Sequence, residues 1–492
     1  MSTIAQEFFS RLARIPTHGL GLSVDVYSPN LFDLLDALRA HHVPYGYLEI
    51  FKASPSALAE VRRRVPQVPL AYHAEGLWLT QPDWSSRHIT QDEIGEVASH
   101  LATLGCYWMN HECATKQMAG VSFGTYLPPL FTAASAAVTA THALHLQQTL
   151  DESRQFAGRH EPLLLLEIPP LTYFAFGDLF VTEFFQQIAD RAPCGFVFDL
   201  GHVWTYYRYS PAWRDQSVAD FLADFLDAFP LDRVVEIHIA GLALHECDIE
   251  QSGESLNHSE PLRWLDAHHA PIPDVLWDML DQVLSHPRLR SLKGVALEVD
   301  TKTISQIVHE LSYAQARFGD RLNTLFDDHA AASISERAEP YAAFRTRSPD
   351  VSEESLDALR SAYDRYARVA SGRIAQSEAT LPSLWMEPGN LGLYRRVYLP
   401  HEILTWGGDV RQMFPDTCRQ LVDRGIDVSM FVDFWFQQPK ILDESYDFFR
   451  LKLDRFPEFV RDVLPEAADT AAGEAEELRN AYATACDTVV IS

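Results

Sequence analysis

The fold is decided by two apolar runs and the stretch between them: PLLLLEIPP (162–170), FVTEFFQQIADR (180–191) and GFVFDLGHVW (195–204). The two apolar runs have strand length and carry few charges, which is typical of parallel strands that are buried on both faces. The stretch between them has helix length. The segment therefore predicts a strand, a crossover helix and a second parallel strand.

The same alternation continues on both sides, from residue 19 to about residue 320. The expected strands are 19–27, 45–51, 69–79, 106–112, 162–170, 195–204, 233–241 and 293–300. The expected helices are 31–42, 91–104, 133–157, 180–191, 217–228, 273–285 and 304–317. Eight such strands over about 300 residues predict the α/β class and a (β/α)₈ TIM barrel.

An open, doubly wound sheet is the alternative fold. It would be expected to carry a GxGxxG turn after its first strand, and this sequence has none there. A polar, His-rich insertion at 242–272 follows the seventh expected strand. Connections of this length are uncommon unless they have a function or are disordered, and a barrel would place this one beside its active site.

The chain has 492 residues, which predicts at least two domains. We expect a barrel domain at 1–325, a Pro- and Ser-containing linker at 326–350, and a second, mostly α-helical domain at 351–492. Helices are expected near 354–378, 410–424, 441–464 and 467–486.

Composition limits the partners. The formal net charge of −28 argues against binding to a nucleic-acid backbone. No apolar run of about 18 residues predicts a transmembrane helix, and the N-terminus does not read as a secretory signal. The six cysteines include no CxxC pair, so we expect neither a disulfide framework nor a thiolate zinc site, and a cytoplasmic location.

Polar residues gather near the carboxyl ends of the expected strands, where barrels keep their active sites. They are His73 and Glu75; Asn110, His111 and Glu112; Glu167; Asp199 and His202; Glu236 and His238; Asp266, His268 and His269 in the following loop; and Glu298 and Asp300. Buried carboxylates must be paired or bind a metal, because unpaired burial costs several kcal/mol.

Histidine and carboxylate ligands without thiolate suit iron, manganese or zinc. The candidates exceed the ligands of one ion, which favours more than one metal. Taken singly, a histidine on a strand is usually structural, and a carboxylate such as Glu49 or Glu236 often only caps a loop or pairs with a cation. His245 and His258 are expected at the surface, and His401 has no paired ligand in view.

Seven motifs in this order resemble the multinuclear non-haem iron-dependent oxidases, the family that includes the oxidase of methanobactin biosynthesis. The motifs are HAEGL (73–77), NH (110–111), LEIPP (166–170), FDLGHVW (198–204), DRVVEIHIAG (232–241), LDAHHAPIPDVLW (265–277) and ALEVD (296–300). The resemblance covers roughly 18–315. It implies a TIM barrel and these metal ligands: His73, His111, Glu167, Asp199, His238, Asp266, His268 and Glu298.

The chain departs from the family pattern at three places. Family members usually carry Asn-Asn where this chain has Gly201 and His202, so His202 is a further candidate ligand. Leu242 stands where many members have histidine, and Ile168 stands where they have asparagine. These departures indicate a divergent branch.

The resemblance implies an O₂-dependent oxidation at two or three iron ions of mixed Fe(II)/Fe(III) valence. Glu167, Asp199 and His268 would be the catalytic residues. The substrate would be a peptide, with cysteine as the expected reacting residue, or a small molecule. The second domain would present a precursor peptide, close over the barrel, or only pack or form a homodimer.

Two other functions stay open. One is a redox-neutral isomerase or hydrolase of the xylose-isomerase-like barrels, which also hold divalent metals at strand ends. The other is a metal-binding or scaffold protein without catalysis.

Overall fold

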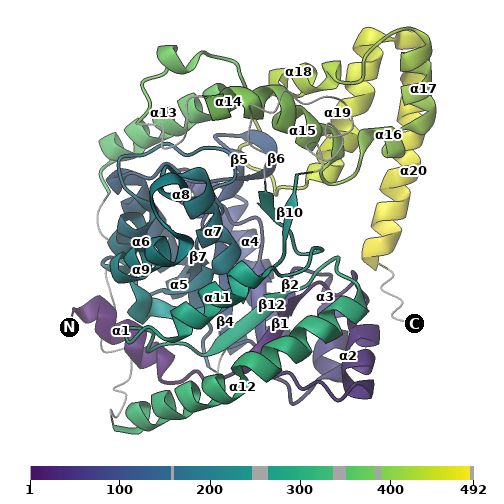
Figure 1. Cartoon of the computed structure of the whole chain (residues 1–492). Coiled ribbons are helices and arrows are strands. Elements are labelled where there is room, and N and C mark those ends of the chain that lie inside the picture. Colours follow the sequence, from purple (N-terminus) through teal and green to yellow (C-terminus); the bar gives the residue numbers. More distant parts are fainter. Residues whose placement is uncertain (1, 157–159, 246–263, 336–350, 383–388, 488–492) are drawn as a thin grey trace.

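The computed structural model describes residues 2–156, 160–245, 264–335, 351–382 and 389–487. Its centre is a closed barrel of eight parallel strands (Figure 1), paired in the order β1-β12-β9-β8-β7-β4-β3-β2. These strands are β1 (Gly19–Val24), β2 (Leu48–Phe51), β3 (Leu70–Ala74), β4 (Trp108–Glu112), β7 (Leu163–Glu167), β8 (Gly195–Asp199), β9 (Val234–Ile239) and β12 (Gly294–Glu298). The predicted TIM barrel and its eight strands are confirmed.

Amphipathic helices surround the barrel. In α2 (Leu31–Ala40), Leu31, Leu34, Leu35 and Leu38 are buried, as the 3.6-residue period predicts. The other helices predicted for this ring are α4 (Thr90–Leu104), α5 (Ala133–Glu152), α6 (Val181–Ala189), α9 (Val218–Ala228), α11 (Asp274–Leu284) and α12 (Ile304–Ser335). A further helix that was not predicted, α3 (Pro55–Arg64), connects β2 to β3.

A short helix at the start of the chain, α1 (Thr3–Leu12), closes the amino-terminal end of the barrel and was not predicted. Phe8 and Leu12 pack with Tyr47 and Trp108 in an apolar cluster of their own. A Cβ at Gly21 would lie 2.4 Å from the Tyr47 ring, so only glycine lets this ring fill the barrel floor.

The predicted strand 195–204 is wrong in its second half. The strand β8 ends at Asp199, and the helix α7 (Leu200–Tyr209) begins at the next residue. The Asp199 side chain caps this helix, because its Oδ1 accepts a hydrogen bond of 2.5 Å from the backbone N–H of His202. His202 therefore lies on a helix and not on a strand.

Two antiparallel hairpins follow barrel strands. The first joins β5 (Thr115–Met118) to β6 (Val121–Leu127), and the second joins β10 (Leu242–Leu244) to β11 (Trp264–Asp266). The second one occupies the insertion predicted at 242–272. His258, within that insertion, lies outside the described residues.

The carboxyl-terminal region is mostly helical, as predicted. Its helices are α13 (Glu353–Ala370), α14 (Gly389–Leu393), α15 (Leu399–Thr405), α16 (Val410–Met413), α17 (Pro415–Asp423), α18 (Met430–Gln437), α19 (Phe448–Val463) and α20 (Ala468–Asp487). Within the described ranges, no helix combines the length and apolar character needed to cross a membrane.

This helical region packs against the β5–β6 hairpin (Figure 1). The Trp435 indole donates a hydrogen bond of 2.8 Å to the Ser122 carbonyl, and the Tyr446 hydroxyl donates one of 2.8 Å to the Phe123 carbonyl. Apolar side chains of both regions belong to one continuous core. The helices therefore cover the end of the barrel that carries the polar residues.

Candidate metal centre

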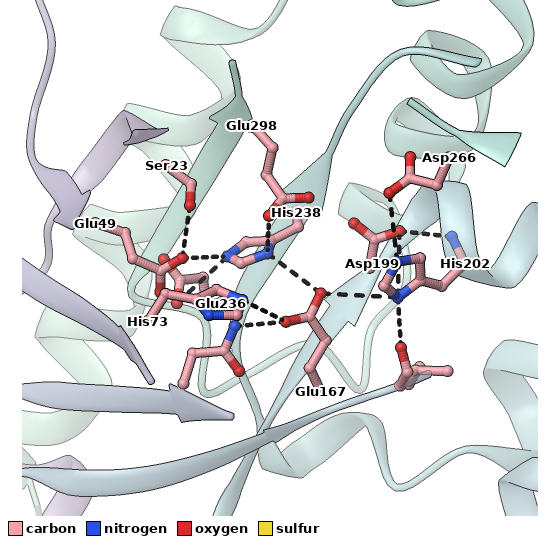
Figure 2. A network of polar contacts seen from close by, with 12 residues as sticks. Ser23, Glu49, His73, Glu167, Asp199, His202, Glu236, His238, Asp266 and Glu298 are labelled. Atoms are coloured by element: carbon pink, nitrogen blue, oxygen red, sulfur yellow. Dashed lines mark hydrogen bonds and ion pairs between the residues drawn. The ribbon is translucent and has the colours of Figure 1, made fainter. Parts of the chain in front are cut away.

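All nine predicted metal-binding residues lie at the carboxyl ends of the barrel strands or on the segments that directly follow them. His73 is on β3, His111 on β4, Glu167 on β7, His238 on β9 and Glu298 on β12, while Asp199 ends β8, His202 is in the first turn of α7, Asp266 ends β11 and His268 follows it. Figure 2 shows that most of these side chains point toward one another.

Glu167 is at the middle of this cluster. Its Oε1 lies 3.4 Å from His238 Nδ1 and 3.7 Å from His202 Nδ1. Its Oε2 lies 3.5 Å from His73 Nε2 and accepts a hydrogen bond of 2.5 Å from the Asn110 amide. One carboxylate thus links side chains from four different barrel elements.

The fully buried imidazole of His238 faces carboxylates on both sides (Figure 2). Its Nδ1 lies 3.3 Å from Glu298 Oε1, and its Nε2 lies 3.2 Å from Glu49 Oε1 and 3.7 Å from Glu236 Oε2. Neither ring nitrogen has a hydrogen bond of acceptable geometry. A metal ion that displaced a proton from this ring would find a suitable nitrogen ligand.

His202 and Asp266 form a second part of the cluster. His202 Nδ1 lies 2.5 Å from the Ile168 carbonyl, a contact that fixes the proton on Nδ1. His202 Nε2 then faces Asp266 Oδ2 at 3.3 Å. A Cβ at Gly201 would lie 2.5 Å from Asp266 Oδ1, so the glycine in this position makes room for the carboxylate.

His268 completes the cluster on the outer side. Its Nε2 lies 3.3 Å from Asp266 Oδ2 and 3.5 Å from Glu298 Oε2, and its Nδ1 is in close contact with Asp300. The His268 side chain is 26 % exposed, whereas His238 is fully buried. Of these two histidines, His268 is therefore the one that solvent or a substrate can reach.

Three adjacent groups of ligand atoms share carboxylates, and in each group one atom per residue lies within 4.8 Å of the others. The groups are Glu167, Asp199, His238 and Glu298; Asp199, His202 and Asp266; and Asp266, His268 and Glu298. Each pair of groups shares one carboxylate, namely Asp199, Asp266 or Glu298. A carboxylate has two oxygens and can bridge two ions, so this pattern fits a cluster of metal ions.

Unpartnered buried atoms support the same interpretation. The buried atoms without a hydrogen bond in the described residues include both ring nitrogens of His238, Nε2 of His111, Oδ2 of Asp199, Oδ1 of Asp266, Oε2 of Glu298 and Oε2 of Glu49. Buried polar atoms are normally satisfied, because leaving them unpaired costs free energy. A bound cation would satisfy these atoms, and their nitrogen and oxygen chemistry suits iron, manganese or zinc.

The electrostatics also favour a cation. Burial raises the pKa of Asp199 well above its usual range, and the negative charges of Asp266 and Glu298 add to this effect. Burial alone would lower the pKa of His238, but the carboxylates of Glu298 and Glu49 raise it well above its usual range. Without a metal the cluster must take up protons to limit repulsion, and a metal ion would take their place.

Neither His73 nor His111 belongs to a group with metal-ligand spacing among the described residues. Burial lowers the pKa of His73, but its contact with Glu167 and the charge of Glu49 outweigh this and raise it to about 9. Burial lowers the pKa of His111 to about 4, which leaves the ring neutral. Its Nδ1 contacts the Glu112 carbonyl at 2.7 Å and its Nε2 has no hydrogen bond, so the ring is prepared to bind a cation.

The sequence treated Glu49 as an ordinary strand-end carboxylate, but the structure places it in the cluster. Its Oε1 lies 3.2 Å from His238 Nε2 and accepts a hydrogen bond of 2.8 Å from the Ser23 hydroxyl. Together with Glu236 and His238 it forms a fourth group with metal-ligand spacing. The signal in the sequence is an acidic residue inside the otherwise apolar strand Leu48–Phe51.

The expectation that His245 lies at the surface is wrong. The residue is 4 % exposed, because it follows β10 and its ring packs 4.5 Å from Tyr398 and 5.3 Å from His401, measured between ring centroids. Neither histidine belongs to a group with metal-ligand spacing among the described residues.

Comparisons with known proteins found similar curated proteins and solved structures. A protein of Rhizobium meliloti named UPF0276 protein RB0508 is 28 % identical over 191 residues, which is 38 % of this chain and 48 % of that protein. A UPF0276 protein of Caulobacter vibrioides is 24 % identical over 278 residues, 55 % of this chain and 84 % of that protein. The chain spans about half the length of the first curated relatives that it matches.

Among solved structures, endonuclease IV from Thermus thermophilus aligns with a TM-score of 0.37 at 16 % identity, covering 62 % of this chain and 100 % of that one. A sugar phosphate isomerase/epimerase from Parabacteroides distasonis aligns with a TM-score of 0.37 at 12 % identity, covering 62 % and 96 %. The assignment of the barrel fold rests on the observed strand pairing and not on these alignments.

A family model is decisive for the assignment. The family described as "RiPP precursor modification enzyme MbnB/TglH/ChrH" matches residues 17–318. This range is more than half of the chain, contains the whole barrel and ends before the carboxyl-terminal helices. The chain therefore belongs to the MbnB/TglH/ChrH family of RiPP precursor modification enzymes.

Proposed function

We propose that this protein oxidises a peptide with O₂ at a cluster of two or three iron ions of mixed valence. The observation that carries the proposal is the set of three ligand groups that share carboxylates in pairs. Membership in a family of peptide-modifying enzymes supports a peptide as the substrate, and we expect a cysteine at its reacting position. Buried, unpaired cysteines in the described ranges fit a reducing cytoplasm.

Nine residues would hold the ions: His73, His111, Glu167, Asp199, His202, His238, Asp266, His268 and Glu298. When bound, iron would take a soft substrate thiolate as a ligand and react with O₂, which allows removal of a neighbouring C–H hydrogen. The chain's own contribution is a mostly buried set of ligands, which barrel strands and the segments after them hold in position.

We assign catalytic roles to Glu167, Asp199 and His268. Glu167 holds the centre together through its contacts with His73 and His238. Asp199 uses one oxygen to cap α7 and leaves the other facing the ligands. The partly exposed His268 keeps its Nε2 toward Asp266 and Glu298, where an incoming substrate would meet it.

We further propose a division into a barrel at 1–325, a linker at 326–350 and a helical domain at 351–492 that presents the peptide or closes over it. Lys116 supports this role. Its Nζ lies 2.5 Å from Glu75, two residues beyond His73, and 5.5 Å from the centre of the Trp406 ring, which is 48 % exposed. An exposed aromatic ring thus lies beside a charged pair that follows a ligand strand.

The domain proposal predicts that Trp406→Ala raises KM for a peptide substrate and leaves iron content unchanged. Trp213→Ala provides a matched control, because Trp213 is 40 % exposed on the short helix α8 (Ala212–Asp215). Equal KM values for both variants would indicate that the helical domain only packs against the barrel or forms a dimer.

Metal analysis together with oxygen uptake tests the proposed function. The full-length protein is loaded anaerobically with Fe(II) and then mixed with O₂ and a cysteine-containing peptide. We expect bound iron, oxygen uptake and a peptide of changed mass. Zinc or manganese in the protein as purified, with no oxygen uptake after loading with Fe(II), would contradict the proposal and favour a redox-neutral isomerase or hydrolase.

A further inference from the structure

Below the metal centre, a buried carboxyl group connects His238 to two aromatic side chains. Glu236 Oε2 lies 3.7 Å from His238 Nε2 and accepts a hydrogen bond of 2.6 Å from the Trp108 indole. Its Oε1 accepts a hydrogen bond of 2.5 Å from the Tyr47 hydroxyl. Trp108, Tyr47 and Glu236 are fully buried, so this contact runs through the barrel interior.

Aromatic rings continue from Trp108 toward the amino-terminal end of the barrel. The ring of His18 lies 4.2 Å from that of Trp108 and 5.4 Å from that of Tyr107, measured between centroids. Tyr107 directly precedes Trp108 in the chain and stacks on His160 at 3.9 Å with an interplanar angle of 7°. Tyr107 is half-buried and lines a small surface recess with Arg14 and Glu161.

The Glu236 carboxyl group and the rings of Trp108, His18 and Tyr107 together form a continuous series of contacts from a proposed metal ligand to the surface. Tryptophan and tyrosine are the side chains that lose one electron most easily. Packing at these distances gives close electronic contact, and the peptide bond between Tyr107 and Trp108 adds a covalent connection. None of these rings is needed to bind a substrate at the opposite end of the barrel.

We propose that Trp108, His18 and Tyr107 form an electron path that joins the metal centre to the amino-terminal face, where an enediol reductant delivers electrons. The proposal rests on the proposed function. A metal centre that reacts with O₂ in the absence of substrate stays oxidised, and it then needs electrons from another source. The path would return such a centre to its reduced state and protect its ligands.

Electrons and protons balance along the path. One electron passes from the Trp108 indole to the oxidised centre, and the indole becomes a radical cation that keeps its Nε1 proton. The Tyr107 phenol then gives one electron to the indole and its proton to solvent, forming a phenoxyl radical. An enediol such as ascorbate donates one hydrogen atom to the phenoxyl radical and leaves as its own radical.

The surroundings of Trp108 suit a transient positive charge. The Glu236 oxygen that accepts the indole N–H stabilises the radical cation. Burial lowers the pKa of His18 to about 3, so the ring between Trp108 and Tyr107 is neutral and does not repel that charge. His18 Nδ1 contacts the Pro16 carbonyl at 2.9 Å, which holds the ring in place.

The first experiment uses the metal-free full-length protein. Illumination with tris(bipyridine)ruthenium and persulfate oxidises tryptophan and tyrosine side chains, and peptide mass spectrometry then measures oxygen addition at Trp108. Trp84 is the internal control, because it is also fully buried but its ring contacts among the described residues are with histidines. We expect several-fold slower oxygen addition at Trp108 than at Trp84, because the Tyr107 phenol returns an electron to the oxidised Trp108 indole.

Two variants test whether Tyr107 is the entry point. Tyr107→Phe keeps the stacked ring but cannot return an electron to the indole, so it should remove this protection and raise oxygen addition at Trp108 to the level of Trp84. Tyr107→Trp should restore the protection. Equal oxidation of Trp108 and Trp84 in the unaltered protein, or no effect of Tyr107→Phe, would overturn the proposal whether or not the protein uses iron.

The second experiment uses the iron-loaded protein with O₂ and ascorbate but no peptide. We expect Tyr107→Phe to increase oxygen addition at the ligand peptides several-fold, and Tyr313→Phe, which changes an exposed ring on α12, to leave it unchanged. Absence of oxygen uptake by the unaltered protein would count against the proposed function alone. Oxygen uptake with equal ligand oxidation in all variants would contradict the path alone.

Discussion

His202 Nε2 lies 3.3 Å from Asp266 Oδ2, although one residue comes from the first turn of α7 and the other from the end of β11. The contact brings together two predicted metal ligands that lie in distant segments of the chain.

His202→Asn should lower the number of iron ions bound per chain and leave the fold intact, because asparagine offers no imidazole nitrogen to the group that contains Asp199 and Asp266. Elemental analysis and Mössbauer spectroscopy after anaerobic loading would measure this. His88→Asn serves as the control, since the His88 side chain is 96 % exposed. Identical iron content in both variants would exclude His202 as a ligand.

Glu49→Gln should weaken iron binding by roughly 10- to 100-fold, the usual range for residues that orient metal ligands. Glutamine can still accept the Ser23 hydrogen bond but lacks the charge that faces His238. Competition with a chelator would measure the affinity, with Glu75→Gln as a control of equal charge change outside the ligand groups. An unchanged affinity would assign Glu49 to the barrel packing only.

Asp300→Asn should lower kcat more than it raises KM, because Asp300 holds the Nδ1 side of His268 and thereby directs its Nε2 toward Asp266 and Glu298. Losses of the order of 10- to 100-fold are expected for such orienting carboxylates. Steady-state kinetics would separate the two constants. A rise in KM alone would indicate that Asp300 contacts the substrate instead.

Stability should fall as pH rises from about 4.5 to about 7, through Glu402. Burial raises the pKa of this carboxyl to about 7, although the Tyr173 hydroxyl donates a hydrogen bond to it. The folded chain therefore holds a proton that the unfolded chain has already released, and linkage makes the free energy of unfolding decrease over this interval.

Glu402→Gln replaces the titrating carboxyl group by a neutral amide. It should raise the free energy of unfolding at pH 7 relative to the unaltered protein, by a few kcal/mol at most. The two proteins should converge near pH 4.5. Denaturant unfolding at several pH values would measure the difference, and Glu354→Gln, on the exposed side of α13, should change nothing. A difference that does not depend on pH would contradict the assignment to Glu402.

The barrel could be predicted because each strand is a local signal. Runs such as Leu163–Glu167 are apolar throughout, and the helices between them carry their apolar residues at helical spacing. The positions of the candidate ligands could be predicted for a related reason, since a charged residue at the end of an apolar strand has to face the barrel mouth.

What the sequence could not show depends on contacts between distant segments. The predicted strand 195–204 extends too far past Asp199, because the strand ends where the Asp199 side chain caps the next helix, and only the folded backbone shows this cap. His245 was placed at the surface, because the rings that bury it, Tyr398 and His401, come from the carboxyl-terminal region. Glu49 could not be told from a loop-capping acid without His238 beside it.

The double use of Asp199 has a consequence for dynamics. One of its oxygens holds the His202 amide at the start of α7, and the other faces the ligand groups, so metal loading and the fraying of this helix share one side chain. Each ion that binds Asp199 should therefore slow the opening of the first turn of α7. Hydrogen–deuterium exchange at the His202 amide would then report occupancy of the centre even in the absence of turnover.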